Sequence, residues 1–212
     1  MAEPVAVRDA LSRWRMADWP LVVRRRLPAS AATAVTDVAL GISLPPHPVS
    51  GAKARIAVTV DLCNVRRIDA PLLLPAVLPV VPDHWRAALL ALHLERLDVL
   101  PVLRVFGSTA WQTITGMSYL GSGSDIDLLV APTTRAELDG CLACLRRHAV
   151  TLPLDGEIVF PSGAAVAWKE WDAVTREGID ADARVLCKHA DHVALSACAE
   201  LVASFDASQA PS

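Results

Sequence analysis

Two carboxylates interrupt an apolar segment in the second half of the chain. Asp125 and Asp127 alternate with Ile126 and Leu128 in the sequence DIDLLV, residues 125–130. Residues two apart on a strand point to the same face, so we expect both carboxylates to aim together while the apolar residues face the core. Two buried, ionised carboxylates repel each other. A divalent cation is their simplest partner, and Mg²⁺ prefers one or two protein carboxylates together with water and substrate phosphate.

A Gly-Ser turn precedes this pair. Gly107 and Ser108 end the apolar sequence PVLRVFG and open the polar sequence STAWQTIT, and Ser108 lies 17 residues before Asp125. Glycine permits close backbone approach, and the free N–H groups at the start of a helix bind phosphate. Two Mg²⁺ ions a few ångströms apart can hold the attacking and leaving oxygens of an in-line phosphoryl displacement. Either motif alone is a weak signal, and an exposed strand edge would explain the aspartates equally well, but the combination favours polyphosphate chemistry.

The elements around these motifs follow from periodicity and from turn residues. Helices are expected at 83–97, at 108–115 with a capping box between Thr109 and Gln112, and at 133–149. Strands are expected at 101–107, at 125–131, and as a hairpin of 156–160 with 164–171. Residues 184–202 fit either a strand pair that turns at 189–192 or a helix.

The first part of the chain has a different character. The sequences PLVVRRR (20–26) and KARIAVTVDL (53–62) have strand character, whereas the proline-rich segment 70–82 is expected to connect two lobes. These patterns predict an α+β fold in which a mixed sheet is flanked by helices. They predict a smaller β-rich N-terminal lobe at residues 1–82, used for recognition of the substrate or of a partner, and a catalytic domain at residues 83–205.

Composition narrows the function further. The chain has 212 residues with a net charge of −3 and 5% aromatic residues, which argues against nucleic-acid binding. No signal peptide or membrane-spanning stretch is visible, so we expect no membrane partner and a cytoplasmic location. Cys141 and Cys144 fall within an expected helix, where buried apolar residues are a better interpretation than a metal or redox pair.

The sequence FGSTAWQTITGMSYLGSGSDIDLLV (106–130) resembles the nucleotidyltransferase superfamily typified by DNA polymerase beta, with G-S followed by D-x-D on the next strand. Together with residues 20–26 and GEIVFPSGAAVAWKEW (156–171), it is similar to one family: the phosphoribosyl-dephospho-CoA transferases of malonate decarboxylase, or malonate decarboxylase holo-acyl-carrier-protein synthases. The resemblance implies a nucleotidyltransferase-like sheet. It also implies a donor, 2′-(5″-triphosphoribosyl)-3′-dephospho-CoA, whose prosthetic group passes to a serine of the apo acyl carrier subunit with release of pyrophosphate.

The resemblance also implies roles for individual residues. Asp125 and Asp127 would hold Mg²⁺, and Gly107 and Ser108 would grip the departing pyrophosphate. The superfamily uses a third carboxylate on a neighbouring strand, for which Glu157 is the first choice, Asp155 the second and Glu170 the third.

Basic residues would offset the triphosphate charge, and Lys169, Lys188 and Arg25 are the candidates. For each of them, a solvated surface position is the competing interpretation. Arg25 belongs to the run Arg24–Arg26, which could instead meet an acidic carrier protein.

Two other functions fit the same motifs. A nucleotidyltransferase that uses ATP or another nucleoside triphosphate on a small-molecule or protein acceptor would share both G-S and D-x-D. A non-enzymatic binding protein would have lost the chemistry, and the intact motifs argue against this alternative.

Overall fold

The structure is a computed structural model that describes residues 4–24, 36–95, 101–180 and 182–208. Its strands are β1 (Val22–Val23), β2 (Asp37–Ser43), β3 (Arg55–Asp61), β4 (Leu72–Leu73), β5 (Arg104–Val105), β6 (Ile126–Val130), β7 (Leu154–Val159), β8 (Ala165–Ala167), β9 (Arg184–Lys188) and β10 (Val193–Ala197). Its helices are α1 (Pro4–Ala17), α2 (Leu74–Val77), α3 (Asp83–Glu95), α4 (Gly107–Thr115), α5 (Arg135–His148), α6 (Trp168–Thr175) and α7 (Cys198–Ser208).

The strands form two sheets. The small sheet has the order β1-β2-β3 and is antiparallel, and the large sheet has the order β10-β9-β8-β7-β6-β5-β4. In the large sheet β6 and β7 run parallel, with α5 as the crossover between them, and the other neighbours are antiparallel. The α+β class and the smaller β-rich N-terminal lobe are therefore confirmed.

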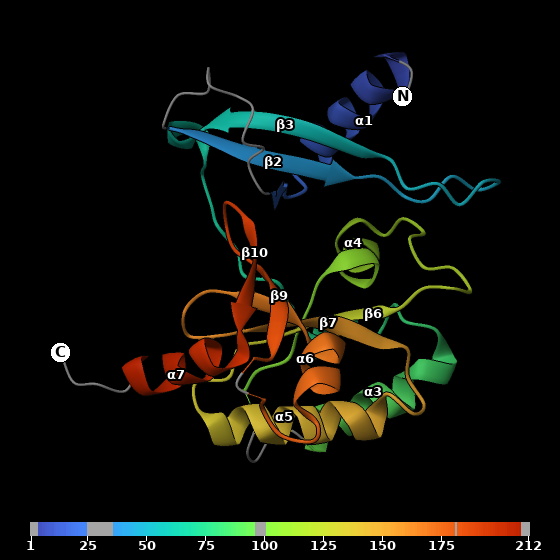
Figure 1. Ribbon diagram of the computed structural model, residues 1–212. Coiled ribbons are helices and arrows are strands. Elements are labelled where there is room, and N and C mark those ends of the chain that lie inside the picture. The colour runs from blue at the N-terminus through green and yellow to red at the C-terminus, as the bar shows by residue number, and fades with distance from the viewer. Residues whose placement is uncertain (1–3, 25–35, 96–100, 181, 209–212) are drawn as a thin grey trace.

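One face of the large sheet is buried by helices. Ile126 and Leu128 of β6 are fully buried and belong to one core cluster with Leu89 of α3 and Leu142 of α5. Figure 1 shows α3 and α5 below the large sheet, α4 between the two sheets, and α1 on the far side of the small sheet. The opposite face of β6 and β7 consequently looks toward α4 and the N-terminal lobe.

The helices predicted from apolar periodicity are present. Helix α3 buries Trp85, Leu89 and Leu92 on one side, as a 3.6-residue period requires. Helix α5 begins after Thr134, whose hydroxyl accepts a hydrogen bond from the Glu137 N–H. These two helices form the floor beneath the strands that carry the aspartates.

Three local predictions need correction. Helix α4 begins at Gly107, so Phe106 is the N-cap residue and Thr109 lies too far inside to cap; the predicted capping box is wrong. The predicted hairpin exists as β7 and β8, but residues from Trp168 onward form α6. Residues 184–202 contain both alternatives, because the pair β9–β10 is followed by α7.

The proline-rich segment 70–82 is more ordered than a connector. It contains the edge strand β4 and the one-turn helix α2, whose Leu74 and Val77 are fully buried. Pro75 lies at the start of α2, where a missing N–H costs nothing. The domain boundary at residue 82 stays a prediction. Within the described ranges, no helix is long and apolar enough to cross a membrane.

Candidate active site

Carboxylates from two neighbouring strands meet on the face of the large sheet that looks toward α4. In the parallel pairing of β6 with β7, Asp127 lies directly opposite Asp155, and Leu129 lies opposite Glu157. Residues in register on adjacent strands share a face, so three carboxylates gather here. Asp125, two residues before Asp127, adds a fourth, and its charge acts on Asp127. The structure thus brings together the two aspartates and both leading candidates for the third carboxylate.

Two glycines allow the close packing of this site. A Cβ added to Gly107 would lie 1.8 Å from Asp127 Oδ2, and one added to Gly156 would lie 1.8 Å from the Leu128 carbonyl oxygen. Both glycines also have positive φ values, of 65° and 127° respectively. The N–H of Phe106 donates to the carbonyl of Asp127 at 3.0 Å, which joins the end of β5 to β6. The predicted Gly-Ser turn therefore packs directly against the Asp127 carboxylate.

This crowding has an electrostatic cost. The pKa of Asp127 rises from 3.8 to about 6, and burial is the largest cause. Repulsion from Asp125 and then from Asp155 adds to the rise, with a smaller contribution from Glu157. The positive charge of Lys53 opposes it. The Asp127 carboxylate therefore lies where additional positive charge would be stabilising.

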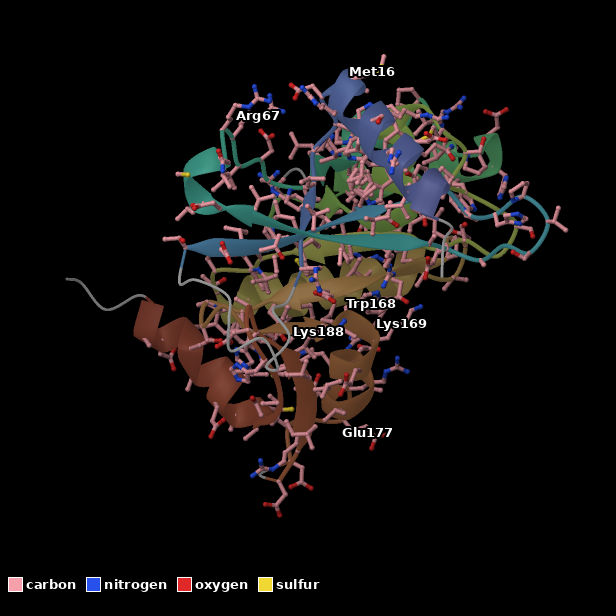
Figure 2. The ribbon with its side chains drawn as sticks, turned by 90° about the horizontal axis from the view of Figure 1, so that it is seen from above. Met16, Arg67, Trp168, Lys169, Glu177 and Lys188 are labelled. Carbon is pink, nitrogen blue, oxygen red and sulfur yellow. The ribbon has the colours of Figure 1, made fainter. Side chains whose placement is uncertain are left out.

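All the lysines of the chain surround these carboxylates. The sequence holds three lysines beside 17 arginines. Lys188 of β9 reaches across the small alanines of β8 to bond Glu157, and Lys169 of α6 lies 3.9 Å from Asp155. In Figure 2, which views the molecule from above, Lys169 and Lys188 lie in projection beside the long strands of the small sheet. Both lysines thus lie beside the carboxylates, each in contact with one of them, and their role in binding phosphate stays a prediction.

The third lysine was missed by our sequence reasoning. Lys53 comes from the N-terminal lobe, and its Nζ donates a hydrogen bond to Ser108 Oγ at 3.1 Å. Ser108 itself is mostly buried, with 9% of its surface exposed. Lys53 and Ser108 are 55 positions apart, so no local pattern could connect them. The rarity of lysine in the chain was the one hint that the sequence offered.

The remaining candidates lie elsewhere. Arg25 falls outside the described residues. Glu170 accepts a hydrogen bond from the Leu186 N–H at 2.8 Å, so its carboxylate is used at the edge of β9. Cys141 and Cys144 are buried in α5, and burial raises their pKa values to about 12 and about 11, as expected of apolar packing residues rather than reactive thiols.

The donor set fits Mg²⁺. Lysines contact Asp155 and Glu157, whereas no ion pair to Asp125 or Asp127 occurs in the part of the chain that the structure describes. Carboxylate oxygens are the ligands that Mg²⁺ prefers, and burial together with repulsion from Asp125 and Asp155 raises the pKa of Asp127. Asp125 and Asp127 are thus the carboxylates that remain available for a metal.

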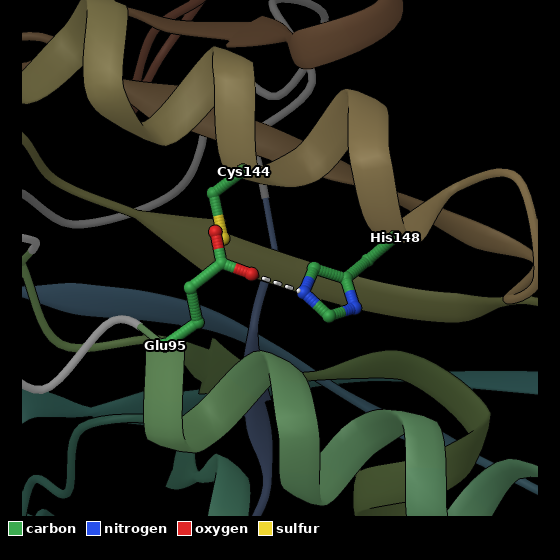
Figure 3. A group of neighbouring side chains, drawn as sticks. All are labelled: Glu95, Cys144 and His148. Carbon is green, nitrogen blue, oxygen red and sulfur yellow. Dashed lines mark hydrogen bonds and ion pairs between the residues drawn. The ribbon is translucent and has the colours of Figure 1, made fainter.

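A second group meets the distance criterion for metal binding. Glu95 of α3 and Cys144 and His148 of α5 bring one potential ligand atom each within 4.8 Å of one another (Figure 3). The carboxylate of Glu95 is shared, however, because Arg147 and His148 both bond it. These contacts hold the pKa of Glu95 at about 2, with the Arg147 hydrogen bond as the largest cause. The observed contacts are those of an ionic clamp between α3 and α5.

Comparison with known proteins places the chain in a family. The profile of the phosphoribosyl-dephospho-CoA transferase MdcG C-terminal domain matches residues 68–199, and that of the corresponding N-terminal domain matches residues 2–71. The chain belongs to the phosphoribosyl-dephospho-CoA transferase family. The family is one of transferases, and the C-terminal match contains every described residue of the carboxylate site except Lys53.

Individual relatives agree with this assignment. A phosphoribosyl-dephospho-CoA transferase of Bradyrhizobium diazoefficiens is 35% identical over 79% of this chain and 72% of its own length. One of Xanthomonas campestris pv. campestris is 36% identical over 76% of this chain and 74% of its own. No solved structure matches at a significant level, so the likeness of the sheet to nucleotidyltransferases stays a prediction.

Proposed function

We propose that this enzyme transfers the phosphoribosyl-dephospho-CoA group from 2′-(5″-triphosphoribosyl)-3′-dephospho-CoA to a serine of the apo acyl carrier subunit of malonate decarboxylase. The observation that carries the proposal is the contact between the Gly107–Ser108 turn and the Asp127 carboxylate. The start of helix α4, where free N–H groups can bind phosphate, lies beside a carboxylate that can bind a cation, and phosphoryl transfer needs both. Membership of the transferase family supports the donor.

The residues of the site have distinct tasks in this reaction. Asp125 and Asp127 would hold Mg²⁺, which supplies charge stabilisation to the phosphate oxygens when bound. The first N–H groups of α4 and the Ser108 hydroxyl bind the outgoing pyrophosphate. The carrier serine oxygen forms a bond to the α-phosphorus while the bond from that phosphorus to the pyrophosphate oxygen breaks. The product is a phosphodiester.

A carboxylate must take the proton of the serine hydroxyl. We assign this role to Asp155, because it lies directly opposite Asp127 whereas Glu157 is one pair further along and is bonded to Lys188. Glu157, the first choice from the sequence, then orients Lys188. Lys169 and Lys188 place two positive charges beside the phosphate-binding surface.

The test is a direct measurement of the product. The purified protein is incubated with the donor, Mg²⁺ and the apo carrier subunit, and the intact mass of the carrier is recorded. We expect one added phosphoribosyl-dephospho-CoA, with loss of the product in EDTA and in Asp125→Asn. The matched control is Asp139→Asn, which removes an exposed carboxylate on α5. An unmodified carrier with a verified donor would contradict the proposal, and turnover of ATP without the carrier would favour the alternative nucleotidyltransferase.

A further inference from the structure

We propose that the N-terminal lobe contributes Lys53 to the active site, where its ammonium group binds the pyrophosphate portion of the donor's triphosphate. This inference rests on the proposed function for its substrate, but it needs only a pyrophosphate-containing ligand. It makes the site a composite of both lobes.

The position of Lys53 is fixed by the backbone around it. The connection between β2 and β3 continues their pairing, because the Leu44 N–H bonds the Ala54 carbonyl at 2.9 Å and the His47 N–H bonds the Ala52 carbonyl at 2.9 Å. Lys53 lies between these two bonded residues. Its side chain therefore starts from a regular hairpin and not from the tip of a free loop.

A second contact ties this hairpin to the catalytic domain. The hydroxyl of Tyr119 donates to the Ser43 carbonyl at 2.7 Å, at the end of β2. Tyr119 is 2% exposed, and Gln112 of α4 accepts a hydrogen bond from its N–H at 3.0 Å. The loop between α4 and β6 thus holds the hairpin against the helix that begins at the Gly-Ser turn. The hydrogen bond between Tyr119 and Ser43 therefore positions the hairpin so that Lys53 reaches Ser108.

Lys53 also differs from the other two lysines in the group that its ammonium contacts. Lys169 and Lys188 contact carboxylates directly, whereas the hydrogen bond of Lys53 goes to the neutral Ser108 hydroxyl and its charge acts on the Asp127 carboxylate without an ion pair to it. An ammonium group has three donors, so two remain when one is given to Ser108. Because Ser108 opens α4, a phosphate at that helix start would meet the ammonium at the same place. The arrangement suits a multiply charged anion better than a neutral ligand.

The experiment measures pyrophosphate affinity separately from catalysis. Magnesium pyrophosphate is titrated into the full chain by calorimetry, and donor KM and kcat are measured by carrier mass. For Lys53→Ala we expect the pyrophosphate Kd and the donor KM to rise about 10-fold, as for loss of one hydrogen bond between charged groups. Lys53→Arg should recover part of the affinity. The control is Arg67→Ala, which removes an exposed positive charge of the N-terminal region.

A labelling measurement does not depend on any variant folding. The wild-type protein is acetylated with and without magnesium pyrophosphate, and peptide mass spectrometry follows each of the three lysines separately. Pyrophosphate should slow the acetylation of Lys53. An unchanged acetylation rate at saturating pyrophosphate would overturn the inference, as would wild-type Kd and KM in Lys53→Ala or an equal loss in Arg67→Ala.

The two proposals fail differently. If the carrier stays unmodified but pyrophosphate binding depends on Lys53, the proposed reaction is wrong and the role of Lys53 stands. If the carrier is modified with the same kinetics by wild type and by Lys53→Ala, the reaction stands and the role of Lys53 is wrong.

Discussion

Replacing Asp127 by Asn should stabilise the metal-free protein while abolishing transfer. The amide keeps the shape of the side chain beside Gly107 but removes a negative charge that burial disfavours and that Asp125 and Asp155 repel. The direction of the pH dependence follows from the raised pKa. Below pH 3.8 the carboxyl is protonated in both folded and unfolded chains, and above about 6 it is ionised in both. Between these values the folded state binds more protons, so wild-type stability falls as pH rises.

The size of the effect follows from the same shift. The rise in the pKa of Asp127 from 3.8 to about 6 would lower the free energy of unfolding by about 3 kcal/mol, at roughly 1.4 kcal/mol per pKa unit. The site is partly open to solvent, which screens such interactions, so we expect about 1–2 kcal/mol. In a chain of this length each kcal/mol moves the melting temperature by about 2–4 °C. At pH 7.5 in EDTA, Asp127→Asn should therefore melt about 2–8 °C above wild type.

Thermal unfolding by circular dichroism checks this at several pH values. The advantage of Asp127→Asn should vanish by pH 4, and saturating Mg²⁺ should stabilise wild type more than the variant, because only the wild type has both ligands. The exposed control Asp139→Asn should stay within about 0.5 kcal/mol of wild type. A variant that is less stable than wild type at pH 7.5, or that keeps the same stability advantage at pH 4, would refute the unfavourable burial and repulsion that we infer for the Asp127 charge. Retained transfer activity would refute the metal-ligand role.

Three further predictions test other parts of the structure. Gly107→Ala should displace the Asp127 carboxylate and adopt a strained backbone, with loss of transfer and a stability cost of about 1–2 kcal/mol, read from carrier mass and urea unfolding. Asp155→Asn should lower kcat more than Glu157→Gln does; the reverse order would return the base role to Glu157. Glu95→Gln should lower the melting temperature at pH 7, because the depressed pKa of Glu95 contributes stability above pH 4.5. That difference should disappear as the pH falls toward 2, and a constant difference would contradict the clamp.

The sequence was sufficient where one short segment determines the geometry. Alternation on a single strand placed Asp127 on the face opposite Ile126 and Leu128, and apolar periodicity located α3 and α5. It failed at α6, because the alternating sequence before Trp168 suggested that the strand continues, whereas the chain forms a helix there whose Trp171 packs against Phe160. Local patterns at such a boundary do not contain the tertiary contact that decides it.

The parts of the site that the sequence did not predict depend on pairing across long distances. Register alone puts Asp155 opposite Asp127, and nothing in the spacing of the chain could choose between it and Glu157. Lys53 reaches Ser108 because a hairpin of another sheet is held by Tyr119. Such contacts become visible only when the order and register of the strands are known.

The carboxylates of the site differ in whether a lysine pairs with them. Lysines already offset Asp155 and Glu157 in the folded chain, so these carboxylates are tolerated without a ligand. Asp125 and Asp127 form no ion pair among the described residues, and burial together with repulsion from Asp125 and Asp155 raises the pKa of Asp127. A cation that binds there removes a repulsion present in the free protein, which adds to its apparent affinity. If the proposed site is correct, we expect this relief of repulsion to favour binding of the cation together with the triphosphate of the donor.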